Sequence, residues 1–382
     1  MLVREDLNVP LSDGRIADVT RIDAALPTLN YLHRRGARTI IMSHLGRPDG
    51  SRVESLSLRA LVPALMARLN LNVQFAPDCI GAQTIEMAKN LKNGEVLLLE
   101  NVRFHPEEEA NEAAFAHQLA QLGELYVNDA FGTAHRAHAS TEGVAHLLPS
   151  AAGLLMEAEL AALSPLISGA VKPFVCVIGG AKIKDKVGVF KNLMERVTAF
   201  CVGGGMANTF LAAQGRNVGK SLRDRDDSIA RMMLEAAKAQ GVEVHLPVDA
   251  VVAPDFDADS KARSVLLDDV HDEMILDIGP KTAQNYARVI EAAKTIVFNG
   301  PMGVYEKKFY QNGTLAIGKA IARATERGAK SVVGGGDAAA AAHELGFADA
   351  MTHVSTGGGA TLEFLEGKTL PGVAALMAKV PS

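Results

Sequence analysis

The sequence has no tryptophan, three cysteines and few aromatic residues, which make up 5% of its 382 residues. Cys79, Cys176 and Cys201 are widely spaced in apolar runs and form no Cys-x-x-Cys pair, so we expect reduced, buried thiols and no disulfide framework. No apolar run approaches the roughly 20 residues that a membrane-spanning helix needs, and no leader-like segment opens the chain. We therefore expect a soluble, cytoplasmic protein with no membrane partner.

Strong charge of one sign is also missing. The formal net charge is −5, so the overall balance does not favour nucleic acid as a partner, and any anion site must be local. At roughly 150 residues per domain, the length predicts two domains.

Short aliphatic runs alternate with alanine- and leucine-rich stretches of helical spacing, as in alternating β and α structure. We expect strands over 38–45, 72–76, 95–104 and 125–131 in the first half, and over 173–180, 199–205, 242–248, 295–301, 330–336 and 352–359 in the second. Nearly continuous apolar strands joined by helices predict parallel sheets that are covered on both faces. Residues 149–170 have leucines at helical spacing, which predicts a helix that connects the two halves.

The two halves end their expected strands differently. Polar and charged residues follow the strands of the first half, and glycines follow those of the second. Ligands of open parallel sheets bind at the carboxyl ends of the strands. Side-chain cations suit a small, highly charged anion, whereas bare glycine backbone suits the close approach of a nucleotide. The sequence therefore suggests two sites on two domains.

Several common site motifs are absent. GRNVGKS at 215–221 has Gln214 where a P-loop needs glycine, so we interpret it as a loop that leads into the next helix. There is no G-x-G-x-x-G, which disfavours NAD, no G-x-S-x-G, and neither H-E-x-x-H nor a tight His/Cys/Asp cluster. We expect no structural zinc site.

Two glycine clusters of the second half directly precede segments whose residue spacing predicts a helix. Gly357–Gly359 would direct backbone N–H groups at an anion, and 334–336 does the same with Asp337 added, a carboxylate suited to Mg²⁺. Lys182 and Lys186 lie four residues apart, on one face of an expected helix start, where both ammonium groups could reach phosphate oxygens. A tight turn for any single glycine cluster and a solvated helix start for the lysines are the alternatives.

Arginines and histidines of the first half form the other candidate group. Its members are Arg21, His44, Arg47, Arg103, His135 and Arg136. A single arginine is more often a surface residue, but as a set in a net-acidic chain they suggest a basic cup for a phosphate and a carboxylate.

These residues belong to a longer pattern. The motifs are REDLNVPL (4–11), TRIDAALPT (20–28), SHLGRP (43–48), ENVRF (100–104), NDAFGTAHRAHAS (128–140), GGAKIKDK (179–186), GGGMANTF (203–210), NGPMGVYE (299–306), GGGD (334–337) and STGGGATLE (355–363). In this order they closely resemble the phosphoglycerate kinases, essentially from end to end.

The resemblance implies two Rossmann-like three-layer domains with parallel sheets, joined by a helix and hinge. It places a 3-phosphoglycerate domain at 1–152, the helix at 153–170, a nucleotide domain at 171–365 and a segment that packs back on the first domain at 366–382. It also implies a monomer that closes its domains and transfers phosphate in line, in glycolysis, between 1,3-bisphosphoglycerate and MgADP, giving 3-phosphoglycerate and MgATP.

Site residues follow from the resemblance position by position. The substrate set is Asp6, Asn8, Arg21, His44, Arg47, Arg103 and Arg136; the catalytic set is Arg21, Lys182, Gly358 and Gly359; and the nucleotide set is Lys186, Gly204, Gly279, Asn299, Glu306, Gly335, Gly336, Asp337 and Ala338. Asp337 is the expected Mg²⁺ position. No general base is expected, because the acceptor carboxylate is already ionised at pH 7.

The chain departs from the family pattern at two places. Ala338 stands where the family usually has Thr or Ser, so a hydroxyl near the nucleotide phosphates is missing. The family also has about ten residues before the segment that begins here at Met1, and we expect such an extension to raise the melting temperature. A binding or sensor protein without catalysis and another small-molecule kinase are the alternatives; the combination of Lys182, Arg21 and Asp337 disfavours the first, and the arginine cup disfavours sugar substrates.

Overall fold

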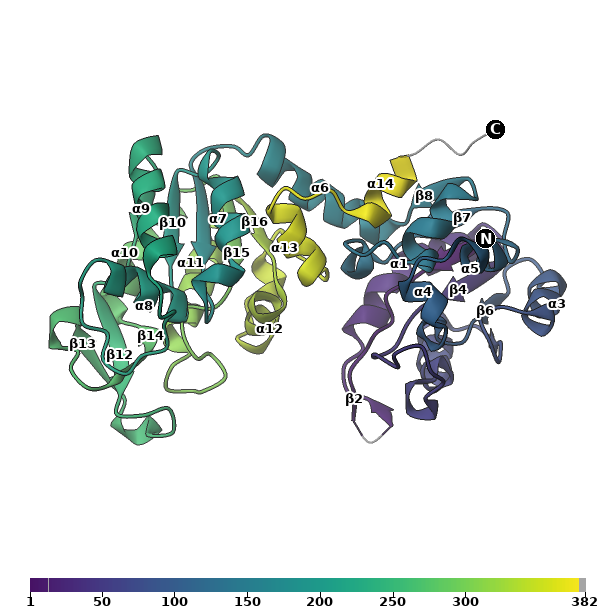
Figure 1. Ribbon diagram of the computed structural model, residues 1–382, viewed down its shortest axis with the longest axis horizontal. Coiled ribbons are helices and arrows are strands. Elements are labelled where there is room, and N and C mark those ends of the chain that lie inside the picture. The colour runs from purple at the N-terminus through teal and green to yellow at the C-terminus, as the bar shows by residue number, and fades with distance from the viewer. Residues whose placement is uncertain (13, 378–382) are drawn as a thin grey trace. The chain divides into compact units, whose positions relative to one another are not determined.

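The computed structural model describes residues 1–12 and 14–377, which divide into two compact units. Unit 1 comprises residues 1–160 together with the segment that begins at Thr369, and unit 2 comprises residues 161–368. Helix α6 (Leu154–Ser168) contains the boundary, within the segment where the sequence predicts a connecting helix. Figure 1 shows the elements of both units.

Unit 1 contains a six-stranded, fully parallel sheet. Its strands, in spatial order, are β5 (Val73–Phe75), β6 (Val96–Leu98), β4 (Thr39–Met42), β1 (Leu2–Arg4), β7 (Tyr126–Asn128) and β8 (Ser150–Ala152). Leu2 and Ile40 pack into one core cluster, whereas Val3 and Ile41 pack into another. Because alternate residues of a strand point to opposite faces, both faces of this sheet are covered, as the sequence predicts.

Helices of unit 1 cover this sheet. They are α1 (Thr20–Arg34), α2 (Val62–Leu69), α3 (Ala82–Asn90), α4 (Pro106–Glu109), α5 (Ala113–Ala120) and α14 (Pro371–Met377). Helix α14, drawn in yellow in Figure 1, packs against unit 1 through Ala375 and through a hydrogen bond from the Gly372 N–H to the Ala134 carbonyl. The last five residues, 378–382, lie outside the described part of the chain.

Strand β1 lies in the middle of its sheet, although it begins at the second residue. Leu2, Val3 and Arg4 pair in register with β4 on one side and β7 on the other. The amino group of Met1 donates to the Arg38 carbonyl at 2.6 Å. The stabilising effect of a preceding extension stays a prediction.

Unit 2 contains a second six-stranded parallel sheet. In spatial order its strands are β11 (Glu243–His245), β10 (Ala199–Val202), β9 (Phe174–Ile178), β15 (Thr295–Asn299), β16 (Lys330–Val333) and β17 (His353–Val354). Its helices are α7 (Val187–Met194), α8 (Gly204–Ala213), α9 (Ser228–Gln240), α10 (Pro280–Glu291), α11 (Asn312–Glu326), α12 (Gly336–Glu344) and α13 (Gly359–Leu365). The GRNVGKS segment is a loop that leads to α9, as predicted.

A three-stranded antiparallel sheet in unit 2 is absent from the sequence prediction. It consists of β13 (Arg263–Leu266), β12 (Asp249–Ala253) and β14 (Met274–Ile278). Its outer strand β13 buries only Val265, so it lacks the continuous apolar run that marks the parallel strands. Strand β8 and the hairpin of β2 (Leu11–Ser12) and β3 (Arg15–Ile16) escaped prediction for the same reason, because they are short and largely exposed.

The cysteine prediction is confirmed, since Cys79, Cys176 and Cys201 are all free and buried. Within the described part of the chain, no helix has the length and apolar character needed to cross a bilayer.

Candidate substrate and nucleotide sites

The predicted substrate residues of unit 1 begin where the strand order of its sheet reverses. Asp6 and Asn8 follow β1, which separates β4 from β7. The Asp6 carboxylate accepts hydrogen bonds from the Arg21 guanidinium and from the Asn8 N–H, the latter at 3.2 Å. Asn8 Oδ1 accepts from the Gly46 N–H at 2.8 Å, and the Gly46 carbonyl accepts from Arg103 Nη1 at 2.8 Å. Asp6, Asn8, Arg21 and Arg103 thus belong to one hydrogen-bonded chain.

His44 corrects one part of the sequence interpretation, which counted it among the cations. Its side chain is buried, and Nδ1 lies 3.1 Å from Arg4 Nη2. Burial, followed by the charges of Arg4 and Arg103, lowers the pKa of His44 well below its ordinary value. Burial likewise lowers the pKa of His138 to about 4. Both rings are neutral at pH 7, so the arginines supply the positive charge.

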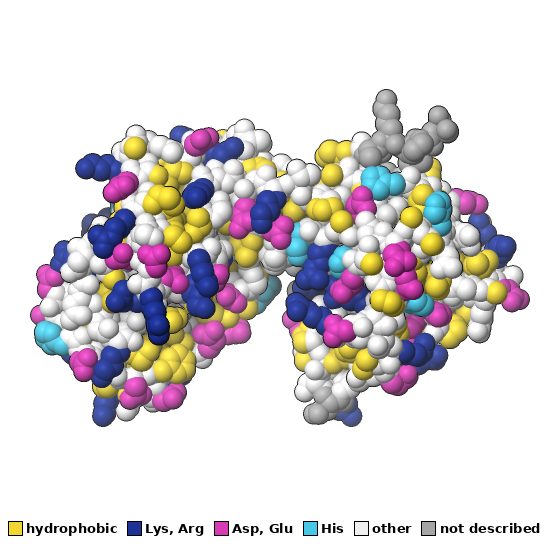
Figure 2. Space-filling view, in the orientation of Figure 1, with side chains coloured by type: hydrophobic (Ala, Val, Ile, Leu, Met, Phe, Trp, Pro, Cys, Tyr) yellow, Lys and Arg dark blue, Asp and Glu magenta, His cyan; other side chains and the backbone are white. Residues whose placement is uncertain are grey.

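The remaining arginines differ in how much of the side chain is free. Arg47 is exposed, whereas Arg136 is half-buried with Nε 3.4 Å from His135 Nε2. Arg103 is 5% exposed and forms an ion pair from Nε to Glu109 Oε1 at 3.2 Å, without the angle of a hydrogen bond. In Figure 2, dark blue cationic side chains gather beside cyan histidines on the visible face of unit 1.

Sequence reasoning missed the buried group that supports this cluster. Arg4 is 1% exposed and donates from Nε to Ser140 Oγ at 2.8 Å. Ser140 in turn donates from its N–H and its hydroxyl to the buried Glu108 carboxylate, at 2.8 and 2.6 Å. Arg4 stands inside the quoted motif REDLNVPL, but nothing in the sequence shows that its partners are Ser140 and Glu108. Its contact with Nδ1 holds the His44 ring in place.

A second buried carboxyl lies next to Asp6 in the chain. Glu5 is fully buried, and neither of its carboxyl oxygens has a hydrogen-bond partner among the described residues. Burial, and then the charge of Asp129, raises the pKa of Glu5 well above its ordinary value. This shift favours the neutral acid, which weakens the positive field of the arginines less than a carboxylate would.

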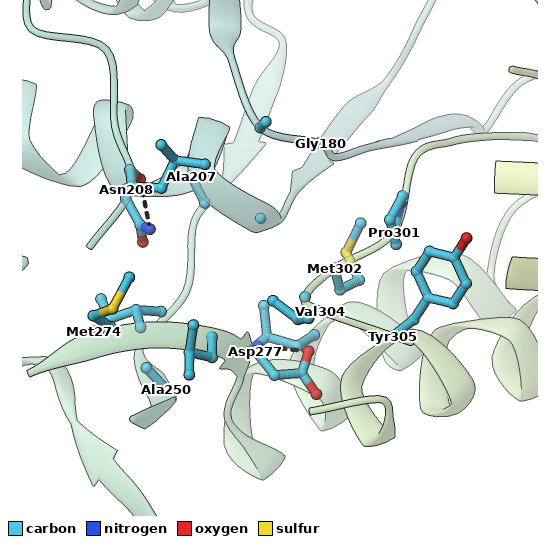
Figure 3. Close-up of a pocket in the computed structure, with 18 of the residues that line it drawn as sticks. Gly180, Ala207, Asn208, Ala250, Met274, Asp277, Pro301, Met302, Val304 and Tyr305 are labelled. Carbon is cyan, nitrogen blue, oxygen red and sulfur yellow. Dashed lines mark hydrogen bonds between the residues drawn. The ribbon is translucent and has the colours of Figure 1, made fainter. Parts of the chain in front are cut away.

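Unit 2 contains a pocket of about 830 Å³ next to the carboxyl ends of strands β9, β10 and β15. As Figure 3 shows, its wall draws Ala207 and Asn208 from α8, Met274 and Asp277 from β14, and Pro301–Tyr305 from the loop after β15. Three of the predicted nucleotide residues line it: Gly204, Glu306 and Asp337. The wall is mostly apolar, and it has the size and composition of a site for a flat organic ring.

Lys186 and Asn299 come together where the strand order of this sheet reverses, between β9 and β15. Lys186 Nζ donates to Asn299 Oδ1 at 2.7 Å, and Asn299 Nδ2 donates to the Gly334 carbonyl at 2.6 Å. Burial lowers the pKa of Lys186, and the charge of Asp337 opposes that shift. The lysine, Asn299, the glycine turn and Asp337 thus form one group at the strand ends.

Lys182 corrects a second expectation, because it does not share a helix face with Lys186. Its backbone is extended, with φ −129° and ψ 136°, and a short 3₁₀ helix, η7 (Ile183–Asp185), separates the two lysines. The Lys182 side chain is exposed, whereas that of Lys186 is half-buried. The pair therefore consists of one solvated lysine and one fixed by Asn299.

The glycines that end the strands of unit 2 serve the protein's own packing. A Cβ on Gly179 would lie 2.0 Å from the Pro301 carbonyl oxygen, and one on Gly204, at φ +67°, would lie 2.7 Å from the Gly180 carbonyl oxygen. Neighbouring strand ends therefore approach backbone to backbone. Gly180, Gly204 and Gly205 also line the pocket, so this packing leaves bare backbone facing it.

Other predicted nucleotide residues lie outside the pocket wall. Gly279 precedes α10 and packs against Asp249, whose side chain a Cβ would meet at 2.2 Å. Ala338 is 1% exposed and packs in the core, so only its backbone can serve a ligand. Gly335, at φ +101°, and Gly336 open α12, while Gly358 precedes α13, which begins at Gly359.

Three further pocket residues were not anticipated. Asp277 is buried and accepts from the Gly313 N–H at 2.6 Å at the start of α11, and burial raises its pKa to about 8. Phe256 and Lys307 lie at the wall together, with Lys307 Nζ 4.1 Å from the Phe256 ring centroid. Phe256 lies between the expected strands 242–248 and 295–301, and no sequence signal linked it to Lys307.

The fold and these two sites define a phosphotransferase with two α/β units, one gathering arginines and the other offering a glycine-edged pocket beside a buried lysine. The family model for phosphoglycerate kinase matches residues 1–368, and the chain belongs to this family. It is 52% identical over 381 residues to phosphoglycerate kinase from Moorella thermoacetica, covering 99% of this chain and 96% of the relative. With that from Koribacter versatilis it is 52% identical over 390 residues, with the same two coverages.

Solved structures agree with the sequence comparisons. The structure of phosphoglycerate kinase from Coxiella burnetii matches with a TM-score of 0.90 and 41% identity, covering 100% of this chain and 96% of that one. The crystal structure of the enzyme from Pyrococcus horikoshii OT3 matches with a TM-score of 0.82 and 34% identity, over 98% and 95% of the two chains. The chain is thus a kinase of the phosphoglycerate kinase family, and the resemblance stated from its motifs is confirmed.

Proposed function

We propose that the chain catalyses reversible phosphoryl transfer between 1,3-bisphosphoglycerate and MgADP, giving 3-phosphoglycerate and MgATP. The observation that carries this proposal is the separation of chemistry between the units: arginines with neutral histidines in unit 1, and a pocket bordered by Lys186, Asn299 and Asp337 in unit 2. A small anion with a carboxylate and a phosphate suits the first, and a nucleotide suits the second.

Substrate binding in unit 1 rests on guanidinium groups. Arg47 and Arg136 have free donor capacity for the phosphate, while the Asp6 carboxylate orients Arg21. His44, neutral and held by Arg4, can accept or donate a hydrogen bond without adding charge. The acceptor carboxylate has a reference pKa of about 3.5, so it attacks as the anion and needs no base.

The phosphoryl group in flight requires charge compensation more than proton transfer. We assign this role to Lys182 and Arg21, together with the backbone N–H groups at Gly358 and Gly359. Lys186, fixed by Asn299, and the turn at Gly335–Gly336 face the nucleotide phosphates in this proposal. Gly204, Gly279, Asn299, Glu306 and the backbone of Ala338 complete the nucleotide site.

Asp337 is the residue that would hold Mg²⁺ with the nucleotide. It is a carboxylate in the first turn of α12, close enough to Lys186 to act on its pKa, and one carboxylate combined with phosphate oxygens is a usual Mg²⁺ ligand set. When bound, the cation would neutralise charge on the phosphates.

The test is an assay in the direction of ATP consumption with 3-phosphoglycerate and MgATP, coupled to reduction of the acyl phosphate formed. We expect turnover that depends on both substrates, and D-glycerate, which lacks the phosphate, should be a poor acceptor. Equal rates with D-glycerate would contradict the role of the arginines. No turnover of either acceptor would contradict the proposed reaction.

Domain closure, a monomeric state and a cytoplasmic location complete the proposal. Direct transfer requires ligands of the two units to share one phosphoryl group, so we expect closure when both are bound. Small-angle scattering should give a smaller radius of gyration with 3-phosphoglycerate and a non-hydrolysable MgATP analogue together than with either alone. A radius that stays constant across these states would argue against closure.

A further inference from the structure

Three metal-ligating side chains meet in unit 1, and the proposed reaction uses none of them. Asp78 and Cys79 lie in the loop between β5 and α3, and His105 lies between the short 3₁₀ helix η3 (Val102–Phe104) and α4. Their ligand atoms all lie within 4.8 Å of one another, and His105 Nε2 is 2.7 Å from Asp78 Oδ1. Cys79 is fully buried, whereas Asp78 and His105 are partly exposed. The group therefore lies at the boundary between core and solvent.

We propose that Asp78, Cys79 and His105 bind a transition-metal cation, with Zn²⁺ as the ion that fits best. Sulfur, imidazole nitrogen and carboxylate oxygen are all ligands of Zn²⁺, and three protein ligands leave a fourth position for water. Mg²⁺ and Ca²⁺ prefer oxygen alone, so the sulfur donor separates this site from the proposed Mg²⁺ position at Asp337.

The distances require only a small adjustment. Ligand bonds of about 2.0–2.3 Å in a tetrahedron place donor atoms about 3.3–3.5 Å apart. The Asp78–His105 separation of 2.7 Å has to lengthen by about half an ångström to reach this value, and no separation in the group exceeds it by more than about 1.5 Å. Rotation of the partly exposed side chains of Asp78 and His105 is enough for such shifts.

The surrounding charge favours a cation. The hydrogen bond that His105 donates to Asp78 is the largest cause that raises the pKa of His105, and the charges of Asp78, Glu107 and Glu108 raise it further. Glu107 Oε2 is buried and has no hydrogen-bond partner among the described residues. Burial, and then Asp78 and Glu108, also raise the pKa of Cys79, so the thiol is protonated without metal. Metal binding forms S–metal, N–metal and O–metal bonds, displaces water from the cation and releases the thiol proton, with any proton on His105, to solvent.

The loop that carries two of the ligands is already fixed. Arg52 Nη1 donates to the Pro77 carbonyl at 3.0 Å, and Thr84 Oγ1 donates to the Asp78 carbonyl, also at 3.0 Å. The His105 ring packs on Phe115 with 5.2 Å between ring centroids. Binding therefore orders few additional groups, which favours affinity.

Titration of the chelator-treated full chain with Co²⁺ tests the proposal, because a cobalt–thiolate bond gives a charge-transfer absorption that other ligands do not. We expect this band with one Co²⁺ per chain, and its loss when Zn²⁺ is added. Cys79→Ser should abolish the band, whereas Cys176→Ser and Cys201→Ser, which alter the other buried thiols, should retain it. A chain that gives no band, or a band that survives Cys79→Ser, would overturn the site.

A second pair of variants guards against a fold that does not tolerate serine at position 79. His105→Gln changes a partly exposed side chain and should abolish the band and the rise in melting temperature on adding Zn²⁺. The matched control is His146→Gln. His146 Nε2 also contacts a carboxylate oxygen, Glu142 Oε1, at 2.5 Å, but His146 does not belong to the group of ligand side chains that Cys79 completes. Equal behaviour of the two histidine variants would contradict the proposal.

Discussion

Each of the two units contains a six-stranded parallel sheet, but different kinds of residue follow the carboxyl ends of the strands in the two sheets. Unit 1 uses charged side chains that bond to one another, from Asp6 through Asn8 to Arg103. Unit 2 uses backbone, small residues and an apolar wall, with a single lysine fixed by Asn299. Cationic side chains can surround a small anion on several sides, whereas a larger ligand needs space and backbone donors. In the proposed function, the same type of sheet would thus support two kinds of recognition.

The largest effect is expected at Lys182. This residue belongs to unit 2, but its side chain is exposed and does not line the pocket of that unit. Lys182→Ala should lower kcat by about 10²–10³-fold and change either KM much less, because its charge is needed mainly in the transition state. Steady-state kinetics with both substrates varied checks this. Lys184→Ala, which removes a neighbouring exposed lysine, should be close to wild type, and an unchanged kcat in Lys182→Ala would refute the assignment.

Arginine variants of unit 1 should separate binding from structure. Arg47→Met removes an exposed guanidinium and should lower the affinity for 3-phosphoglycerate about 10–100-fold, because one or more charge-assisted hydrogen bonds are lost. The melting temperature should not change. Arg103→Met also leaves the Gly46 carbonyl and Glu109 without their partner, so it should lower both affinity and melting temperature.

Calorimetric titration of each ligand separately is the measurement for this pair. MgATP binding should stay near wild type in both variants, since the nucleotide site is assigned to unit 2. Arg34→Met, an exposed arginine at the end of α1, is the control and should change neither affinity. If the variants lost affinity for 3-phosphoglycerate and for MgATP to the same degree, the assignment of the two ligands to different units would be wrong.

A smaller effect is expected at the pocket wall of unit 2. Lys307 Nζ donates to the Phe256 carbonyl at 2.6 Å and to Asp257 Oδ1 at 3.0 Å, and so holds this wall in place. Lys307→Met should raise the KM for MgATP about fivefold, the loss of roughly 1 kcal/mol, and leave the KM for 3-phosphoglycerate unchanged. Lys308→Met is the control, and a change in the KM for 3-phosphoglycerate alone would contradict the placement.

The last prediction concerns the pH dependence of stability. Burial raises the pKa of Asp277 to about 8, so the folded state keeps a proton that the unfolded state loses above its ordinary pKa of 3.8. The contribution of Asp277 to the free energy of unfolding is therefore most favourable at low pH, and it declines as the pH rises from about 4 to about 8. Asp277→Asn mimics the protonated acid, so its melting temperature should exceed that of wild type by a margin that grows between pH 5 and 8. Calorimetry across this range checks it, and a constant margin would be inconsistent with a buried, protonated carboxyl.

Much of the fold could be predicted from the sequence, because most of its parallel strands are apolar on both faces. Each expected parallel strand has a counterpart, such as β4 in 38–45 and β15 in 295–301. The antiparallel sheet of β12, β13 and β14 could not be predicted, because its outer strand β13 is largely exposed and lacks the apolar run of the parallel strands. Motif spacing located the candidate site residues, but not which of them are charged, buried or fixed.

By itself, the sequence determined the sheet-and-helix alternation, the family and the positions of the arginines and glycines, since these depend on local residue type and order. Only the tertiary structure decided that His44 is neutral, that Lys186 is fixed by Asn299 while Lys182 is not, and that Asp78, Cys79 and His105 meet. The physical reason is that the pKa of a group and the partners of a ligand depend on burial and on charges brought close by folding, which a linear order of residues does not contain.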